Sequence, residues 1–410
     1  MLDLEVALSS VFDNRFELSL GSPFCHCVTV LKQFDKEIQE IQVWYSDQNP
    51  LMNDLVLNLS RDGIKLMFDP YNQRLKMIEI NDMDKVSLKY HGKHFNSPTV
   101  SPTIEQINQS FGSTTPCTEI FDENKQRFVM NFRGLAFFFS ADDAQTHPEG
   151  GARSGYRRLS SPSGIIKVTK LQIYHGASFT ESQAPEIPLS VYNGICFLVK
   201  ADVERANNVF SSLKLTLNTH KLGADNEEIR QFQTSITFGL PAQEVDSRLG
   251  APTKIYYKSH DKMKIHSPVD RQREGLKSDY IYNYFSLGLD LIFDGASHKL
   301  KKILLHTNYP GHYNFNIYMR CNFTIPLTLE LSAEQRMSNP YQSEQLSITP
   351  YTKWNDIVPS NRQAPVVLRR KESLNSINPF GCTFCHGLQD MIFEVMKNGH
   401  IAAVTIYQPF

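Results

Sequence analysis

The sequence lacks a strong excess of charge and long apolar runs. Its 410 residues include 42 Lys and Arg against 43 Asp and Glu, which gives a formal net charge of −1. This balance argues against nucleic-acid binding, because phosphates favour a basic protein face. No apolar stretch approaches the roughly 20 residues of a membrane-spanning helix, and the N-terminus carries acids where a secretory signal carries positive charge. We therefore expect a soluble, intracellular protein.

Cysteine is sparse, and the common catalytic motifs are missing. The 7 cysteines are an odd number in mostly apolar surroundings, which favours reduced core thiols over a disulfide framework. Cys382 to His386 matches a haem-attachment pattern or half a zinc site, but no second ligand pair lies nearby, so a structural strand is the better interpretation. No phosphate loop, nucleophile elbow or kinase signature is present. We expect no enzyme, no cofactor and no metal.

A unit that returns four times is the strongest positive signal. Gly63 to Asp69 precedes a Leu-x-x-Ile-x-Ile segment, and Gly288 to Asp294 precedes Leu-x-x-Ile-x-Leu at the same spacing. Looser copies begin at Gly134 and Gly387. Alternation with period two predicts a β-hairpin in each copy.

Helices are expected before the hairpins. Apolar helical stretches follow Pro23 and Pro241, because proline is favoured near a helix start. Another helix is expected between Thr103, as N-cap, and Gly112, as C-terminal stop. These patterns predict a β-rich α+β fold of about four repeated units, each a helix plus an antiparallel hairpin or meander.

Composition divides the chain into five expected segments, with the main boundary between Gly223 and Glu228. They are a first helix-plus-sheet unit at 1–100, a second at 101–180, a β-rich connector at 181–234, a third unit at 235–330 and a C-terminal β unit at 331–410. Residues 140–164 have almost no apolar content and are predicted to be a disordered insertion. Within it, Ser160 and Ser161 follow paired arginines and are candidate phosphorylation sites.

Two segments are candidates for recognition. A basic cluster beside two tyrosines could bind an anionic headgroup or an acidic partner, or be a solvated strand and loop; its cations are Lys258, Lys262, Lys264, Arg271 and Arg273. The segment from His306 to Tyr318 is rich in aromatic and amide side chains, which favour protein contact. Its candidate partner-binding residues are Tyr309, His312, Tyr313, Phe315 and Tyr318. The alternative is a loop packed over its own sheet edge.

A hydrolase-like site is the remaining alternative. It would require the histidines of these two segments to converge in space with a carboxylate. The histidines concerned are His260, His266, His306 and His312.

Long strings of this sequence resemble the phagosome assembly factor 1 family. They include Asp62 to Asp69, Ser101 to Ile107, Asn131 to Leu135, Asp261 to Pro268 and His306 to Tyr318. The resemblance covers nearly the whole chain, and departs from the family pattern at 140–164 and 222–232.

The resemblance implies a non-enzymatic autophagy regulator, cytoplasmic at rest, that acts as an adaptor. Such a protein would form a complex with a WD40 β-propeller protein and be recruited to the phagophore, the pre-autophagosomal structure. Phosphoinositide recognition in that family is associated chiefly with the propeller partner, and the resemblance identifies no catalytic residue. The rival interpretation is direct binding of phosphoinositides or the membrane surface through the basic cluster.

Overall fold

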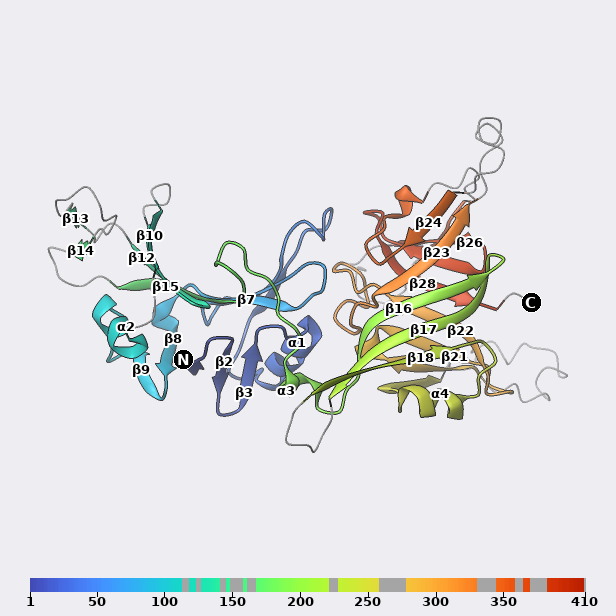
Figure 1. Cartoon of the computed structure of the whole chain (residues 1–410), viewed down its shortest axis with the longest axis horizontal. Coiled ribbons are helices and arrows are strands. Elements are labelled where there is room, and N and C mark those ends of the chain that lie inside the picture. The colour runs from blue at the N-terminus through green and yellow to red at the C-terminus, as the bar shows by residue number, and fades with distance from the viewer. Residues whose placement is uncertain are drawn as a thin grey trace, which may run out of the picture. The chain divides into compact units, whose positions relative to one another are not determined.

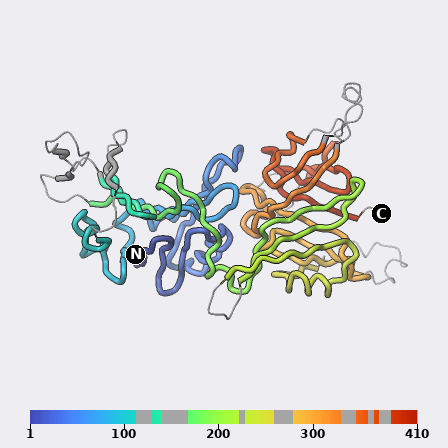
Figure 2. Tube along the Cα trace, in the orientation of Figure 1, coloured from blue at the N-terminus to red at the C-terminus, as the bar shows by residue number. Residues whose placement is uncertain are grey.

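The computed structural model describes eleven stretches of the chain: residues 1–112, 118–122, 127–140, 145–147, 158–160, 167–220, 228–257, 278–329, 344–357, 364–368 and 382–408. They divide into two compact units. Unit 1 comprises Met1–Ser46 and Pro50–Val191, and unit 2 comprises Asp47–Asn49 and Tyr192–Phe410. Figure 2 traces unit 1 from blue to green and unit 2 from green to red.

Unit 1 contains a five-stranded and an eight-stranded sheet. In spatial order the five-stranded sheet consists of β3 (Phe16–Ser19), β2 (Ser10–Asp13), β1 (Leu2–Val6), β8 (Val86–Tyr90) and β9 (Lys93–Asn96). The eight-stranded sheet consists of β10 (Thr118–Asp122), β11 (Arg127–Phe132), β12 (Leu135–Ser140), β15 (Val168–Tyr174), β7 (Leu75–Ile80), β6 (Ile64–Phe68), β5 (Leu55–Leu59) and β4 (Ile41–Trp44). A separate strand pair is formed by β13 (Gln145–His147) and β14 (Arg158–Ser160).

Unit 2 is built from two sheets of the same sizes, labelled in Figure 1. Its five-stranded sheet consists of β18 (Ile229–Ile236), β17 (Val209–His220), β16 (Phe197–Ala206), β23 (Phe323–Leu329) and β24 (Glu344–Ile348). Its eight-stranded sheet consists of β25 (Val366–Leu368), β26 (Thr383–Leu388), β27 (Met391–Val395), β28 (Ile401–Tyr407), β22 (Leu300–His306), β21 (Leu289–Phe293), β20 (Tyr280–Tyr284) and β19 (Lys254–Tyr257).

The strands of the two units are ordered and paired in the same way. In each five-stranded sheet the first strand of the unit pairs in parallel with a later one, β1 with β8 and β16 with β23. In each eight-stranded sheet the last strand lies in the middle, β15 between β12 and β7, and β28 between β27 and β22. The bulges also correspond, because the register shifts at Met67/Phe68 in unit 1 and at Ile292/Phe293 in unit 2. Unit 2 therefore repeats the topology of unit 1.

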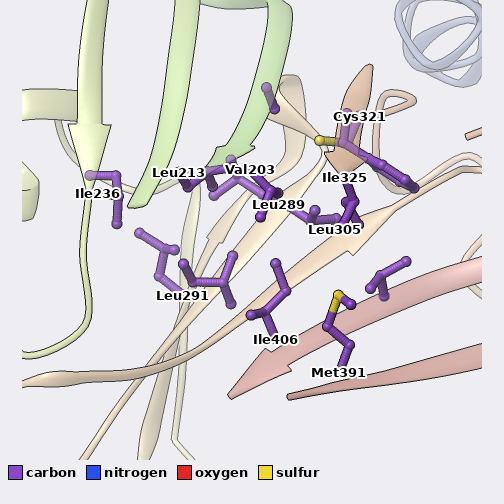
Figure 3. Packing of buried hydrophobic residues seen from close by; sticks show 14 of the residues in the cluster. Val203, Leu213, Ile236, Leu289, Leu291, Leu305, Cys321, Ile325, Met391 and Ile406 are labelled. Atoms are coloured by element: carbon purple, nitrogen blue, oxygen red, sulfur yellow. The ribbon is translucent and has the colours of Figure 1, made fainter. Parts of the chain in front are cut away.

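The core of unit 2 lies between its two sheets. Val203 and Leu213 extend from the five-stranded sheet toward Leu289, Leu291 and neighbouring side chains of the eight-stranded sheet (Figure 3). Strand side chains alternate between faces, so one apolar face of each sheet supplies this core. Helix α4 (Ala242–Leu249) adds its buried Val245 and Leu249 and its partly buried Ala242.

The predicted α+β fold of four helix-plus-hairpin units is wrong. In the described ranges, α-helix is confined to α1 (Phe24–Gln33), α2 (Ile104–Phe111), α3 (Leu189–Tyr192) and α4, with short 3-10 turns at Met83–Lys85, Phe285–Leu287 and Trp354–Asp356. The fold is mostly sheet, and in unit 2 a second sheet, rather than a layer of helices, covers the large sheet. The four predicted hairpins do form, but pairings of β7 with β15 and of β22 with β28 join them two by two into continuous sheets.

The positions of α1, α2 and α4 were predicted correctly, whereas α3 lies in the segment predicted to be a β-rich connector and was not predicted. Helices α1 and α4 begin after Pro23 and Pro241, which occupy their N-cap positions. In α2 the Thr103 hydroxyl accepts a hydrogen bond from the Gln106 N–H at 3.2 Å, and Gly112 forms the C-cap with φ +79°. None of the helices in the described ranges combines the length and the apolar character of a membrane-spanning segment.

Candidate functional site

The segment His306 to Tyr318 begins at the end of β22 and leads toward β23, and it is anchored in unit 2 by buried side chains. Tyr309 is fully buried, and its hydroxyl donates to the Pro350 carbonyl at 2.9 Å. The Arg320 guanidinium lies 4.7 Å from the centre of the Tyr309 ring. Thr307 donates from its hydroxyl to the carbonyls of Ile401 and Ala402. The loop is therefore a fixed part of unit 2 and not a loose connection.

A buried carboxylate, Asp290, joins the two ends of this segment. Asp290 Oδ2 lies 2.9 Å from His306 Nε2 and accepts from the Tyr318 hydroxyl at 2.9 Å, while Asp290 Oδ1 accepts from the Asn283 amide at 2.8 Å. The His306 and Tyr318 rings stack 3.8 Å apart. Burial, followed by the Asp290 charge, raises the pKa of Tyr318, so its phenol remains a donor. All four side chains are buried, and their polar groups hydrogen-bond to one another.

His306 and His312 belong to different pairs. His312 Nε2 lies 3.2 Å from Glu394 Oε1, which also accepts from the Thr383 hydroxyl at 2.7 Å. The other two histidines of the predicted hydrolase-like cluster, His260 and His266, lie outside the described residues. Within the described ranges, no group of three or more His, Cys, Asp or Glu is placed to bind a metal. Cys385 and His386 lie on β26, in keeping with the structural interpretation of Cys382 to His386.

The exposed part of the loop differs from the predicted set. Tyr309, His312 and Tyr318 are buried and Phe315 is half-buried, whereas Tyr313 is 38% and Ile317 is 44% exposed. Asn314 donates from its amide to the Tyr313 hydroxyl at 2.7 Å, which orients that ring. The sequence pattern identifies aromatic side chains but does not show which of them are buried. It gave no reason to include the aliphatic Ile317, which was therefore missed.

Three other predictions fall largely outside the described residues. The basic residues Lys258, Lys262, Lys264, Arg271 and Arg273 lie there, and so does Ser161. Ser160 ends β14, where its backbone pairs with Gln145. The rest of the predicted 140–164 insertion, apart from Ser140, β13 and β14, is also outside the described residues.

An ion pair that the sequence did not reveal joins the two sheets of unit 2. Arg205, at the end of β16, donates to Asp390 in the turn before β27, and each side chain is 5% exposed. Asp390 Oδ2 also accepts from the Phe210 N–H at 2.7 Å. The two residues are 185 positions apart, so no local pattern could indicate the pair.

The burial of His400 is expected to make the stability of unit 2 dependent on pH. Its ring is 2% exposed and lies 4.6 Å from the Tyr309 ring. Burial, aided by the charges of Lys353 and Arg320, lowers the pKa of His400 from 6.5 to about 4. The unfolded chain therefore binds the proton first as the pH falls from about 6.5 toward about 4, and the free energy of unfolding decreases.

Between pH 7 and pH 5 the free energy of unfolding of wild type is expected to fall by about 1–2 kcal/mol more than that of the His400→Gln variant. Urea unfolding of wild type and His400→Gln at both pH values measures this difference, and His175→Gln, the same substitution at an exposed histidine, is the control. Parallel pH profiles for wild type and His400→Gln would contradict the assignment.

Comparison with known proteins gives a consistent family. A sequence model of the family described as phagosome assembly factor 1 (PHAF1) matches residues 14–407. The chain is 43% identical to a PHAF1 protein of Drosophila melanogaster, over 99% of this chain and 94% of the relative. It is 33% identical to one of Caenorhabditis elegans, over 96% and 91% of the two chains, and 31% identical to one of Arabidopsis thaliana, over 98% and 93%. No solved structure matches the chain. The match to the family model and the identity to these relatives both show that the chain belongs to the phagosome assembly factor 1 family.

Proposed function

We propose that this protein is a non-enzymatic autophagy adaptor that binds a WD40 β-propeller protein and is recruited with it to the phagophore. Membership of a family named for phagosome assembly supports an autophagy-related role. The propeller partner, the recruitment and the cytoplasmic resting location are parts of the proposal.

The anchored loop of unit 2 is the observation that supports a binding role. Tyr313 and Ile317 are presented by a loop whose neighbouring side chains Tyr309, His312 and Tyr318 are buried and hydrogen-bonded. A preformed aromatic and apolar surface loses little conformational entropy on association. The residues that could carry acid–base chemistry, Asp290 and His306, are instead buried and bonded to each other, which favours a structural role for them.

Affinity purification from fed and starved cells tests the proposal. Wild type is compared with a Tyr313→Ala and Ile317→Asp double variant, and with Val209→Asp, a control for an apolar residue of unit 2 that is 44% exposed. We expect wild type and the control to capture a WD40 propeller protein. The double variant should capture at least ten-fold less of that protein, because a central contact is removed. Absence of a propeller protein from the wild-type sample contradicts the proposed function. Equal capture by the double variant contradicts only the location of the contact.

The same preparations distinguish the rival, direct phosphoinositide binding. Charge reversal at Lys262 and Lys264 would abolish flotation with phosphoinositide-containing vesicles if these lysines contact phosphates. The adaptor proposal expects that variant to retain the propeller protein, since the contact it assigns is formed by Tyr313 and Ile317.

A further inference from the structure

The turn that precedes helix α1 in unit 1 has a structural equivalent before helix α4 in unit 2. In unit 1 the Gly21 N–H donates to the Leu75 carbonyl at 2.7 Å, and in unit 2 the Gly239 N–H donates to the Leu300 carbonyl at 2.8 Å. Each leucine N–H donates back to the carbonyl of the residue after the glycine, at 2.9 Å in both units. Both glycines are left-handed, with φ +87° and +81°. Gly239 is therefore the counterpart of Gly21.

Unit 1 covers its turn with a segment of its own chain. Residues 183–188, which connect β15 to α3 (Figure 1), contain Pro185 and Pro188, and proline restricts both itself and the residue before it to extended conformations. The Glu186 carbonyl oxygen occupies the place that a Cβ on Gly21 would take, and the Pro185 carbonyl oxygen would lie 3.1 Å from such an atom. The segment thus lies directly on the glycine, and a larger residue there would displace it.

Unit 2 leaves the equivalent turn uncovered within the described part of the chain. A Cβ on Gly239 would meet no described atom within 4 Å. Gly239 and Pro241 are exposed and Phe238 and Leu240 are half-buried, whereas the four corresponding residues of unit 1, at 20–23, are all buried. Phe238 and Leu240 pack partly on the core of unit 2. The turn at 238–241 therefore offers apolar area on both sides of an accessible glycine.

We propose that the turn at 238–241 binds an extended, proline-containing segment of another protein. A backbone carbonyl of this segment lies over Gly239, as the Glu186 carbonyl lies over Gly21, and its apolar side chains contact Phe238 and Leu240. Proline keeps the segment extended before it binds, so association costs little conformational entropy. Unit 1 supports this choice of ligand, because a segment of the same chemistry already lies on the equivalent turn.

The ligand is assigned to another protein and not to a second copy of this chain. Residues 183–188 of each copy already lie on the Gly21 of that copy, so they are not available to a neighbour. The inference goes beyond the adaptor function, because it specifies the chemistry of a ligand and uses residues other than Tyr313 and Ile317.

Phage display on the full chain tests the inference. A random twelve-residue library is depleted on the Gly239→Ala variant and then selected on wild type. We expect the enriched peptides to contain proline. In fluorescence anisotropy they should bind Gly239→Ala at least ten-fold more weakly than wild type, because the added Cβ takes the place of the peptide carbonyl.

Gly194→Ala is the matched control for backbone strain. Gly194 has φ +78°, and a Cβ there would also meet no described atom within 4 Å. It precedes the start of β16, which the strand registers place beside the start of β18, whereas Gly239 follows the end of β18. This variant should bind the peptides like wild type. Equal weakening by the two variants would contradict a contact at Gly239.

Photo-crosslinking locates the bound peptide. An enriched peptide with benzoylphenylalanine beside its proline should crosslink to the tryptic fragment 231–248, which contains the turn. Lack of enrichment, enrichment of peptides without proline, crosslinking to another fragment, or a dimer of the free chain that Gly239→Ala abolishes would each overturn the inference. Since the probe is a synthetic peptide, these outcomes are independent of whether a propeller protein co-purifies.

Discussion

Replacing Asp390 with alanine is expected to lower the free energy of unfolding by about 3–5 kcal/mol, because it leaves a buried cation without its partner. The carboxylate accepts from Arg205 and from the Phe210 N–H; in the variant Arg205 keeps its hydrogen bond to the Asn208 carbonyl but loses its carboxylate partner. Burial already lowers the pKa of Arg205, against the influence of Asp390, so the guanidinium is costly to keep in the core. Urea unfolding of the purified chain measures the change.

The matched control is Asp202→Ala on the same strand as Arg205. Asp202 pairs with Lys200 at 2.8 Å, but the two side chains are 34% and 51% exposed. Solvent screens such a pair, so the expected loss is below about 1 kcal/mol. A double variant, Arg205→Met with Asp390→Leu, should be more stable than Asp390→Ala, since no buried charge remains. Equal losses for Asp390→Ala and Asp202→Ala would show that the buried pair has no special weight.

Replacing Gly288 with alanine is expected to cost about 3 kcal/mol or more, from backbone strain and a steric clash together. Gly288 is left-handed, with φ +69° and ψ +28°. A Cβ there would lie 2.3 Å from the Met319 carbonyl oxygen and 2.7 Å from the Cys321 nitrogen. Both atoms belong to the backbone that ends the anchored loop, so the variant should also alter the surface that carries Tyr313.

Gly239 separates the two contributions. Its φ is +81°, yet a Cβ would meet no atom within 4 Å. Gly239→Ala therefore bears only the conformational cost, about 1–2 kcal/mol. Thermal and urea unfolding of the two variants measure the difference between them. A Gly288→Ala chain no less stable than Gly239→Ala would mean that the loop backbone moves aside easily.

Local features of this fold could be predicted from sequence, while its layers could not. The hairpin of β6 and β7 was predicted because a turn glycine and strict alternation lie within 18 residues, from Gly63 to Ile80. The joining of β7 to β15 depends on residues about 90 positions apart, such as Ile80 and Leu171. Strand partners at that distance are selected by burial in the finished core, which a local pattern does not contain. Short helices that follow a proline were therefore mistaken for a full layer.

The same limit applied to the candidate site. The aromatic and amide-rich segment was recognisable from composition, but Tyr309 and Tyr313 look alike in sequence and have opposite exposure. The difference between them arises from a distant residue: the Tyr309 hydroxyl donates a hydrogen bond to the carbonyl of Pro350, 41 positions away. Asp290 offered one signal that could have been used, because a buried charge in an otherwise apolar strand requires a partner.

The position of β28 has a consequence for how unit 2 is made. This strand comes last among the described strands, yet it lies in the middle of the eight-stranded sheet, bonded to β22 and β27 (Figure 1). On the ribosome, β22 emerges roughly 100 residues ahead of β28, so the edge of β22 that pairs with β28 stays unpaired until β28 has been made. In unit 1 the corresponding last strand, β15, is made much earlier, and its large sheet can then be completed. We therefore expect newly made chains to hold a complete unit 1 beside an unfinished unit 2, and unit 2 to be the part that chaperones protect.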